Sequence, residues 1–256
     1  IDFYPLVTKR QRAESCLRGV SSVTSASGSN SAVARARLIS GNRNYSSWSL
    51  RAWLCLRKAG VDPDTVVVPL DTPEYEQRIG DLSPTRCVPV LWLGDECLWD
   101  SLAIAETVNE RFAASALWPS DERLRAFGRS MAAEMHSGFS ALRTALPMNC
   151  RAQQRQIDID AAVRRDVDRI CELWRAAREL AGSTHWLLGT LSIADCMFAP
   201  VALRFVAYRL DLPDDARSYV AQWNEDSDLQ EWITAAKSEP WVIEHEEVGS
   251  YGTDME

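Results

Sequence analysis

The sequence has few histidines and no paired cysteines, and both absences argue against a metal centre. Its three histidines, His136, His185 and His245, are too scattered to suggest a metal site by their spacing. Its seven cysteines form an odd set without a CxxC pair or a zinc-finger spacing. We therefore predict that no metal is bound, that no disulfide framework supports the fold, and that the compartment is reducing.

Long apolar runs and an excess of positive charge are also absent. No stretch approaches the roughly 18 apolar residues that span a bilayer, so we expect a soluble, cytoplasmic protein with no membrane partner. The sequence has 28 Lys and Arg and 36 Asp and Glu, and the resulting net charge of −8 argues against nucleic acid as a partner. A small anionic ligand stays compatible, because a helix N-terminus or a few arginines can bind it locally.

The chain is long enough for two modest domains, and its first residues differ from the rest. Residues 1–35 are rich in Ser and Ala and carry five Lys or Arg against two acids. We predict a disordered leader there. It also fits an organelle transit peptide, a tag or a misread start, and the chain does not begin with Met.

Residues 36–112 predict a small mixed α/β domain. A strand, a helix and a β-branched strand follow one another within about 35 residues, which is typical of a βαβ unit with a parallel strand pair. A short helix, a hairpin around Gly94 and Asp95, and another helix complete the pattern. The expected strands are 37–40, 65–70, 90–93 and 97–99, and the expected helices are 49–58, 73–81 and 102–112.

The remaining chain predicts a linker over 113–120, an all-helical domain over 121–245 and a tail over 246–256. We find no strand pattern after Ser120. Apolar residues at helical spacing run from Leu124 to Leu146 and stop before Pro147. Ser192 and Asp195 fit the S-x-x-D capping pattern ahead of an apolar run, so we assign Asp195 a structural role.

Four segments, in this order, give the chain a family resemblance. They are NYSSWSLRAWLCLRKAGV, SPTRCVPVL, WDSLAIAETV and LSIADCMFAP. Together they resemble the cytosolic glutathione transferases of the serine type, similar to the zeta and theta classes found in bacteria. The resemblance covers residues 36–240 and implies an α/β plus all-α fold, in which a thioredoxin-like βαβ-ββα domain precedes a helical bundle.

Ser46 and Ser47 precede the helix predicted over 49–58, where backbone N–H groups and the helix dipole favour an anion. The resemblance implies that one of these hydroxyls donates a hydrogen bond to the thiol of glutathione and favours its thiolate. The zeta pattern favours Ser46 and the theta spacing favours Ser47, so both are candidate catalytic residues. The alternative is that both serines are only helix caps.

The other implied contacts bind the rest of glutathione. Val88 precedes Pro89, and the resemblance implies a cis peptide bond that exposes the Val88 backbone to the peptide backbone of glutathione. Asp100 and Ser101 start the last helix of the first domain and would hold the γ-glutamyl ammonium and carboxylate. Arg86 is a further candidate near the glycyl end.

The acceptor site is expected on the first long helix of the second domain, where His136 and Met135 are candidates. A lone histidine or methionine there fits core packing equally well.

The resemblance implies an enzyme that conjugates glutathione, as co-substrate, to an electrophilic and largely apolar acceptor. Trp48 stands where the zeta pattern has cysteine, which weakens an assignment as maleylacetoacetate isomerase. A glutathione-dependent isomerase, an ether-cleaving enzyme and a non-catalytic binding module remain as alternatives. The family usually forms homodimers, and we expect one here.

Overall fold

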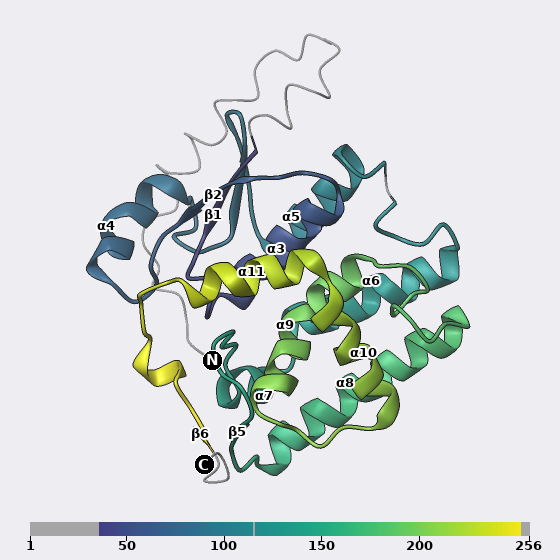
Figure 1. The fold of residues 1–256 in the computed structure, drawn as a ribbon. Coiled ribbons are helices and arrows are strands. Elements are labelled where there is room, and N and C mark those ends of the chain that lie inside the picture. Colours follow the sequence, from purple (N-terminus) through teal and green to yellow (C-terminus); the bar gives the residue numbers. More distant parts are fainter. Residues whose placement is uncertain (1–35, 115, 252–256) are drawn as a thin grey trace.

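The computed structural model describes residues 36–114 and 116–251 (Figure 1). The predicted leader lies outside the described residues. In chain order the first half contains β1 (Ala36–Ser40), α3 (Ser47–Lys58), β2 (Asp64–Val67), α4 (Pro73–Leu82), β3 (Val90–Leu93), β4 (Glu96–Leu98) and α5 (Ser101–Arg111). The second half contains α6 (Glu122–Ser137), α7 (Ser140–Ala145), β5 (Arg155–Gln156), α8 (Ala161–Ala181), α9 (Ile193–Ala207), α10 (Asp214–Glu225), α11 (Ser227–Lys237), the 3-10 helix η2 (Glu244–Glu246) and β6 (Ser250–Tyr251).

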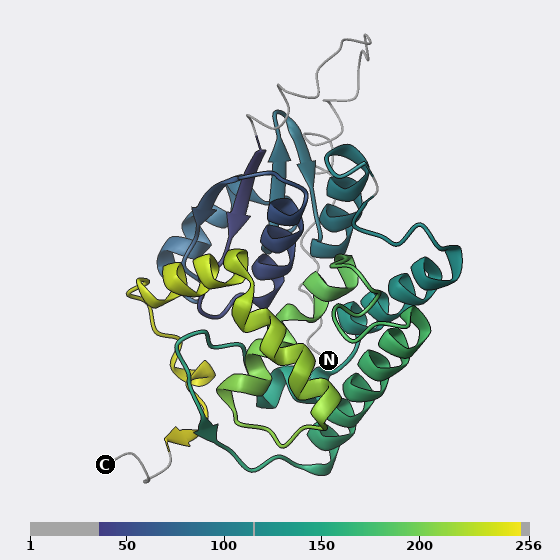
Figure 2. The same cartoon turned by 45° about the vertical axis from the view of Figure 1, so that its right-hand side comes forward.

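The first half is a mixed sheet with helices on both faces, which is the predicted thioredoxin-like arrangement (Figures 1 and 2). The strand order is β2-β1-β3-β4; β1 pairs parallel with β2 and antiparallel with β3. Successive side chains of a strand point to opposite faces. Leu38 accordingly packs in the core with α3 and α5, whereas Ile39 packs beneath Tyr75 and Leu82 of α4.

The strand β2 is shorter than predicted and lies at the edge of the sheet. Its pairing with β1 ends at Val67, two residues before Pro69. Pro69 has no N–H to donate to a ladder, and an edge position tolerates such a residue.

The second half is mainly helical, with α9 at its centre. Nearly every residue of α9 is buried, and apolar side chains lie on all sides of this helix, so it can occupy the middle of the bundle. At its start, Asp195 Oδ2 accepts hydrogen bonds from the Ser192 amide at 2.8 Å and the Ser192 hydroxyl at 2.7 Å. Asp195 Oδ1 accepts from the Leu187 amide and the Tyr219 hydroxyl, both at 3.1 Å. The predicted capping role of Asp195 is confirmed.

The structure corrects the prediction of one helical stripe from Leu124 to Leu146. The helix α6 ends at Ser137, and α7 begins at Ser140 after Phe139 adopts a left-handed conformation with φ 58°. Gly138 permits the break, because a Cβ there would lie 2.8 Å from the Glu134 carbonyl oxygen. Periodicity missed the break because the apolar residues of both helices pack into the same core.

The prediction that no strand follows Ser120 is also wrong. Arg155–Gln156 pairs antiparallel with Ser250–Tyr251, so part of the predicted tail is ordered against the helical half. Two-residue strands are too short to produce an alternating pattern, and this pairing joins segments that are distant in the sequence.

The two halves pack through α3, which contacts both α9 and α11. Figure 1 shows α11 crossing from the helical half to lie beside the first half. Trp53 of α3 packs on Trp232 of α11, with ring centroids 5.3 Å apart. At the end of α3, Lys58 Nζ bonds Asp226 at 2.6 Å and Asp228 at 2.7 Å. These contacts fix α11 and the connection between α10 and α11 against the middle and the C-terminal end of α3.

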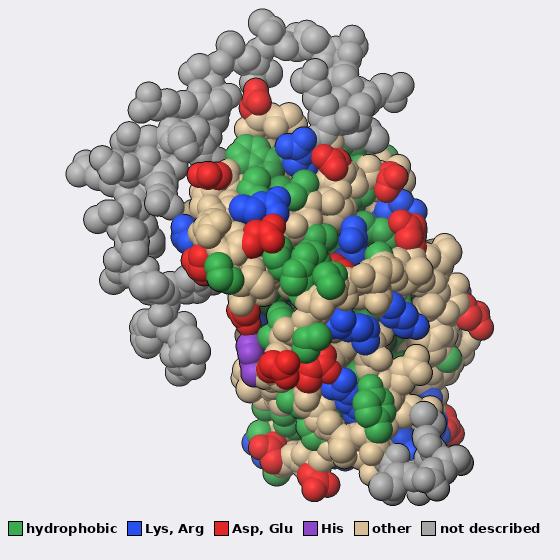
Figure 3. All heavy atoms as spheres, turned by 60° about the vertical axis from the view of Figure 1, so that its left-hand side comes forward, with side chains coloured by type: hydrophobic (Ala, Val, Ile, Leu, Met, Phe, Trp, Pro, Cys, Tyr) green, Lys and Arg blue, Asp and Glu red, His purple; other side chains and the backbone are tan. Residues whose placement is uncertain are grey.

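Acidic and basic side chains are mixed on the face shown in Figure 3, and hydrophobic side chains form only scattered patches there. Within 36–114 and 116–251, none of the helices is both long and apolar enough to cross a membrane.

Candidate functional site

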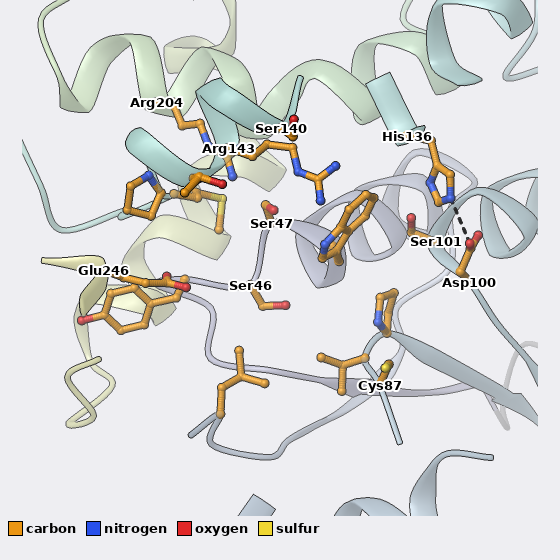
Figure 4. Close-up of a pocket in the computed structure, with 18 of the residues that line it drawn as sticks. Ser46, Ser47, Cys87, Asp100, Ser101, His136, Ser140, Arg143, Arg204 and Glu246 are labelled. Atoms are coloured by element: carbon orange, nitrogen blue, oxygen red, sulfur yellow. Dashed lines mark ion pairs between the residues drawn. The ribbon is translucent and has the colours of Figure 1, made fainter. Parts of the chain in front are cut away.

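A cavity of about 770 Å³ lies between the two halves of the structure. The first half contributes the start of α3, the loop before β3 and the start of α5. The second half contributes the end of α6, the helix α7, Arg204 of α9 and Glu246 of η2. Ser46, Ser47, Val88, Pro89, Asp100, Ser101 and His136 all line it, so most of the predicted site residues come together (Figure 4).

The loop before α3 is held by residues from the far end of the chain. Glu239 accepts hydrogen bonds from the amides of Arg43 at 2.9 Å and Asn44 at 3.3 Å. The Arg43 carbonyl accepts one from the Trp232 indole at 2.9 Å, and Asn44 donates to Asn149 at 3.0 Å. Burial raises the pKa of Glu239, although these amides and nearby arginines oppose the shift. The C-terminal half therefore positions the loop that carries the two serines.

Ser46 is the N-cap of α3, and its hydroxyl group has a defined set of partners. Its Oγ accepts a hydrogen bond from the Ser49 amide at 3.3 Å and lies 2.8 Å from Ser49 Oγ. Ser49 Oγ also accepts from the Gly41 amide at 3.0 Å, and Ser49 is fully buried. If the Ser49 hydroxyl donates to Ser46 Oγ, then the Gly41 amide, the Ser49 amide and the Ser49 hydroxyl all have acceptors. The Ser46 hydroxyl proton is then the one without an acceptor among these groups.

The opposite orientation would leave a buried Ser49 proton with no acceptor among the described residues, which is unfavourable. The geometry therefore favours the Ser49 hydroxyl as donor, and in that arrangement the Ser46 proton is free to bond a group in the cavity. Figure 4 shows the Ser46 hydroxyl pointing into the cavity on the side of Cys87. A hydroxyl that accepts two hydrogen bonds is a stronger donor through its own proton.

Ser47 is the first residue of α3, and its hydroxyl makes no hydrogen bond within the described part of the chain. It lies on the side of the cavity nearer Arg143 (Figure 4). The Trp48 amide, in the first turn of α3, also has no partner there. Such free amides and the helix dipole favour an anion at this end of α3.

The peptide bond between Val88 and Pro89 is cis, as the resemblance implies. Both residues line the cavity, and Cys87 lies beside them. The Cys87 amide donates to Ser83 Oγ at 3.2 Å, which holds the loop before the bond. Arg86 does not line the cavity; it bonds Glu76 of α4 at 2.8 Å on the outer surface.

Asp100 and Ser101 start α5 at another wall of the cavity. Asp100 Oδ1 caps the helix by accepting from the amides of Leu102 at 3.0 Å and Ala103 at 3.4 Å. Its Oδ2 lies 3.0 Å from His136 Nε2, so one carboxylate connects the two halves (Figure 4). The Ser101 hydroxyl is buried and has no partner among the described residues. A ligand with an ammonium and a carboxylate would satisfy this wall.

The wall formed by α7, α9 and η2 is more polar than the predicted acceptor site. It carries Arg143, Arg204 and Glu246, together with the hydroxyls of Ser140 and Thr144. Burial raises the pKa of Glu246 to about 6, and the nearby charges of Asp71 and Glu247 add to the rise, while His245 and Arg204 oppose it.

Met135 is fully buried in the core of the helical half and does not line the cavity. Its place on the helix α6 turns the side chain away from His136, the next residue, which does line it.

A polar network that sequence analysis missed fastens the C-terminal segment to the start of α3. The Tyr45 hydroxyl donates to Glu247 Oε1 at 2.5 Å and accepts from Arg151 at 2.8 Å and from the Ile243 amide at 3.2 Å. Arg155 also pairs with Glu247. Burial favours a higher pKa for Glu247, but the hydrogen bonds from Tyr45 and Arg155 outweigh it and the net pKa is lowered. Tyr45 and Glu247 are 202 residues apart, and no local pattern pairs them.

Across the residues that the structure describes, no three His, Cys, Asp or Glu side chains are grouped so that they could hold a metal ion.

Comparisons with known protein families and solved structures identify the fold that carries this cavity. Residues 45–111 match the family model for the glutathione S-transferase N-terminal domain. No curated protein sequence matches the chain. Similar solved structures include glutathione transferases of several classes. The fold is that of the glutathione transferases.

Three structures illustrate the similarity. A glutathione transferase homologue from Burkholderia, solved with bound glutathione, is 25% identical over 79% of this chain and 98% of its own, with a TM-score of 0.60. A theta class enzyme from Xanthomonas axonopodis pv. citri, also with glutathione bound, is 22% identical over 77% and 96%, with a TM-score of 0.56. A bacterial zeta class maleyl pyruvate isomerase is 23% identical over 78% and 97%, with a TM-score of 0.58.

Proposed function

We propose that this protein is a glutathione transferase that holds the glutathione thiolate at the N-terminus of α3 and adds it to an electrophilic carbon. The observation that carries the proposal is that the Ser46 hydroxyl, at the N-terminus of α3, lines the same cavity as Val88 and Pro89. The proposal is supported by the match of residues 45–111 to the transferase N-terminal domain.

The cavity offers complementary groups for each part of glutathione. The backbone N–H and C=O of Val88 can pair with the peptide backbone of the ligand. The Asp100 carboxylate can bind the γ-glutamyl ammonium, and the Ser101 hydroxyl, which has no partner in the described residues, can donate to the γ-glutamyl carboxylate. These contacts place the sulfur near Ser46, which lies between Cys87 and Arg143 (Figure 4).

The chemistry follows from the groups around the sulfur. The thiol loses its proton to water, and the Ser46 O–H, the Trp48 amide and the dipole of α3 favour the thiolate that remains. A sulfur lone pair then forms a C–S bond. In a substitution the leaving group departs with its electron pair; in an addition the displaced π pair takes a proton from water. Holding both reactants in one cavity supplies the proximity.

Binding and turnover, measured separately, test the proposal. Equilibrium binding of glutathione to the full chain should be accompanied by the ultraviolet absorbance of a thiolate near neutral pH. Conjugation to at least one member of a panel of aryl halides and activated alkenes should exceed the uncatalysed rate. Thiolate formation without conjugation of any electrophile would favour the isomerase or the binding module. Absence of glutathione binding would overturn the proposal altogether.

A further inference from the structure

Three guanidinium groups gather at one wall of the cavity, and none forms an ion pair with a described carboxylate. Arg143 of α7 and Arg204 of α9 line the cavity, and Arg51 of α3 lies fully buried behind it. The other buried or half-buried arginines that bear on this region, Arg151 and Arg155, are engaged by the C-terminal segment.

The indole ring of Trp48 joins two of these charges. The guanidinium carbon of Arg51 lies 4.2 Å from the ring centroid, and that of Arg143 lies 4.5 Å from it. Arg51 Nε donates to the Met197 carbonyl at 3.0 Å, but its Nη1 and Nη2 have no partner among the described residues. The aromatic face stabilises the cations without neutralising them.

This arrangement leaves the positive charge only partly compensated, because Glu246 is the acidic side chain that lines the same wall and it forms no ion pair with these arginines among the described residues. Burial lowers the pKa of Arg204 to about 10, with a contribution from the charge of Arg143. Burial, followed by the charges of Arg204 and Arg143, also lowers the pKa of Arg51. Arginine stays protonated in proteins, so both shifts express a cost that a bound anion would relieve.

Donors remain available for such an anion. Arg204 donates hydrogen bonds from Nε to the Leu146 carbonyl at 2.7 Å and from Nη1 to the Pro200 carbonyl at 3.3 Å. Its Nη2 has no partner among the described residues. Among the described residues, Arg143 donates a single hydrogen bond, from Nη1 to the Gly138 carbonyl at 3.3 Å. The hydroxyl of Ser140 lies on the same wall.

We propose that the acceptor is a small electrophile bearing a carboxylate, and that Arg143 and Arg204 bind this carboxylate while the electrophilic carbon faces the sulfur held at Ser46. The inference rests on the proposed function and names its substrate class. The arginines lie on the opposite side of the cavity from Cys87, so they are not placed for the contact assigned to the peptide backbone of glutathione (Figure 4). The predicted largely apolar acceptor would leave them unpaired.

A matched pair of electrophiles tests the proposal. 4-Chloro-3-nitrobenzoate and 4-chloro-3-nitrobenzamide differ in charge but hardly in shape, and both lose chloride to a thiolate. After division by each uncatalysed rate with glutathione, kcat/KM should favour the benzoate by about tenfold or more, the effect of a charge-assisted hydrogen bond. Arg143→Met should reduce this preference to near unity, and Arg143→Lys should retain part of it.

Arg165→Met is the control, since it removes the same charge from an exposed position on α8 outside the cavity. Equal rates for the two electrophiles in the unmodified enzyme would overturn the inference while leaving the transferase intact. A higher KM for glutathione in Arg143→Met, with the preference unchanged, would assign the arginine to glutathione and also overturn it.

Calorimetry separates failure of the inference from failure of the proposed function. With S-methylglutathione bound, the protein should bind 3-nitrobenzoate about tenfold more tightly than 3-nitrobenzamide, and Arg143→Met should abolish the difference. If the protein prefers 3-nitrobenzoate but conjugates neither aryl chloride, the carboxylate site would be supported and conjugation as the reaction would be overturned. No preference for the anion in either experiment would overturn the carboxylate site.

Discussion

Replacing Ser46 by alanine tests the assignment of the thiolate donor. The Ser46 proton is free to bond the sulfur when the Ser49 hydroxyl donates to Ser46 Oγ, the orientation that its buried contacts favour. A hydrogen bond to a charged group contributes about 1.5 to 3 kcal/mol. Because one pKa unit corresponds to about 1.4 kcal/mol, Ser46→Ala should raise the pKa of bound glutathione by about one to two units. Turnover near neutral pH should fall about 10- to 100-fold, while the affinity for glutathione holds.

The same change also removes the N-cap of α3, which should cost about 0.5 to 2 kcal/mol of unfolding free energy. Thermal unfolding should therefore be measured first, and the titration run well below the melting temperature. Ser47→Ala is the matched control, because it removes a hydroxyl one residue away and leaves the cap in place. Ser49→Ala should raise the thiolate pKa by a smaller amount, since the Ser46 hydroxyl loses one of its donors but keeps its proton.

The decisive measurement is the ultraviolet absorbance of the bound thiolate against pH in the unmodified protein and the three variants. An upward shift in Ser47→Ala with none in Ser46→Ala would refute the hydrogen-bond argument and assign the role to Ser47. No shift in either variant would show that both serines are structural and that the helix N-terminus alone favours the thiolate.

Four further predictions concern stability, binding and assembly. Asp195→Ala should lower the unfolding free energy by about 3 kcal/mol, more than a cap alone, because four buried donors lose their acceptor; a loss below about 1 kcal/mol in denaturant titrations would contradict this. Asp100→Asn should keep the melting temperature, since asparagine also caps helices, yet weaken glutathione binding about tenfold; calorimetry showing unchanged affinity would remove the ammonium contact. Protonation of Glu246 below its pKa of about 6 removes a negative charge from the cavity. The affinity for 3-nitrobenzoate should therefore be about threefold higher at pH 5.5 than at pH 7.5. The Glu246→Gln variant should bind 3-nitrobenzoate with the same affinity at both pH values. Light scattering at micromolar concentration should show a dimer; a stable monomer would contradict the homodimer inferred from the family.

Local sequence patterns were enough to predict most of the fold. The β-branched run before Pro69 and the two apolar runs around the turn residues Gly94 and Asp95 mark strands, because strand propensity and turn chemistry act within a few residues. The Ser192–Asp195 spacing identified a helix cap for the same reason. The four quoted segments also pointed to Ser46, Val88 and Asp100, which the structure brings to one cavity.

Tertiary structure decided the features that depend on contacts between distant segments. Local spacing could not choose between the two serines; the contacts of Ser46 with Ser49, and of Ser49 with Gly41, exist only in the folded chain and support Ser46 in the proposed function. After the break at Gly138, α7 places Arg143 on the same cavity wall as Arg204 of α9, although the two residues are distant in the sequence. The charge of a cavity wall depends on which side chains converge there without partners, and that convergence is set by packing between helices.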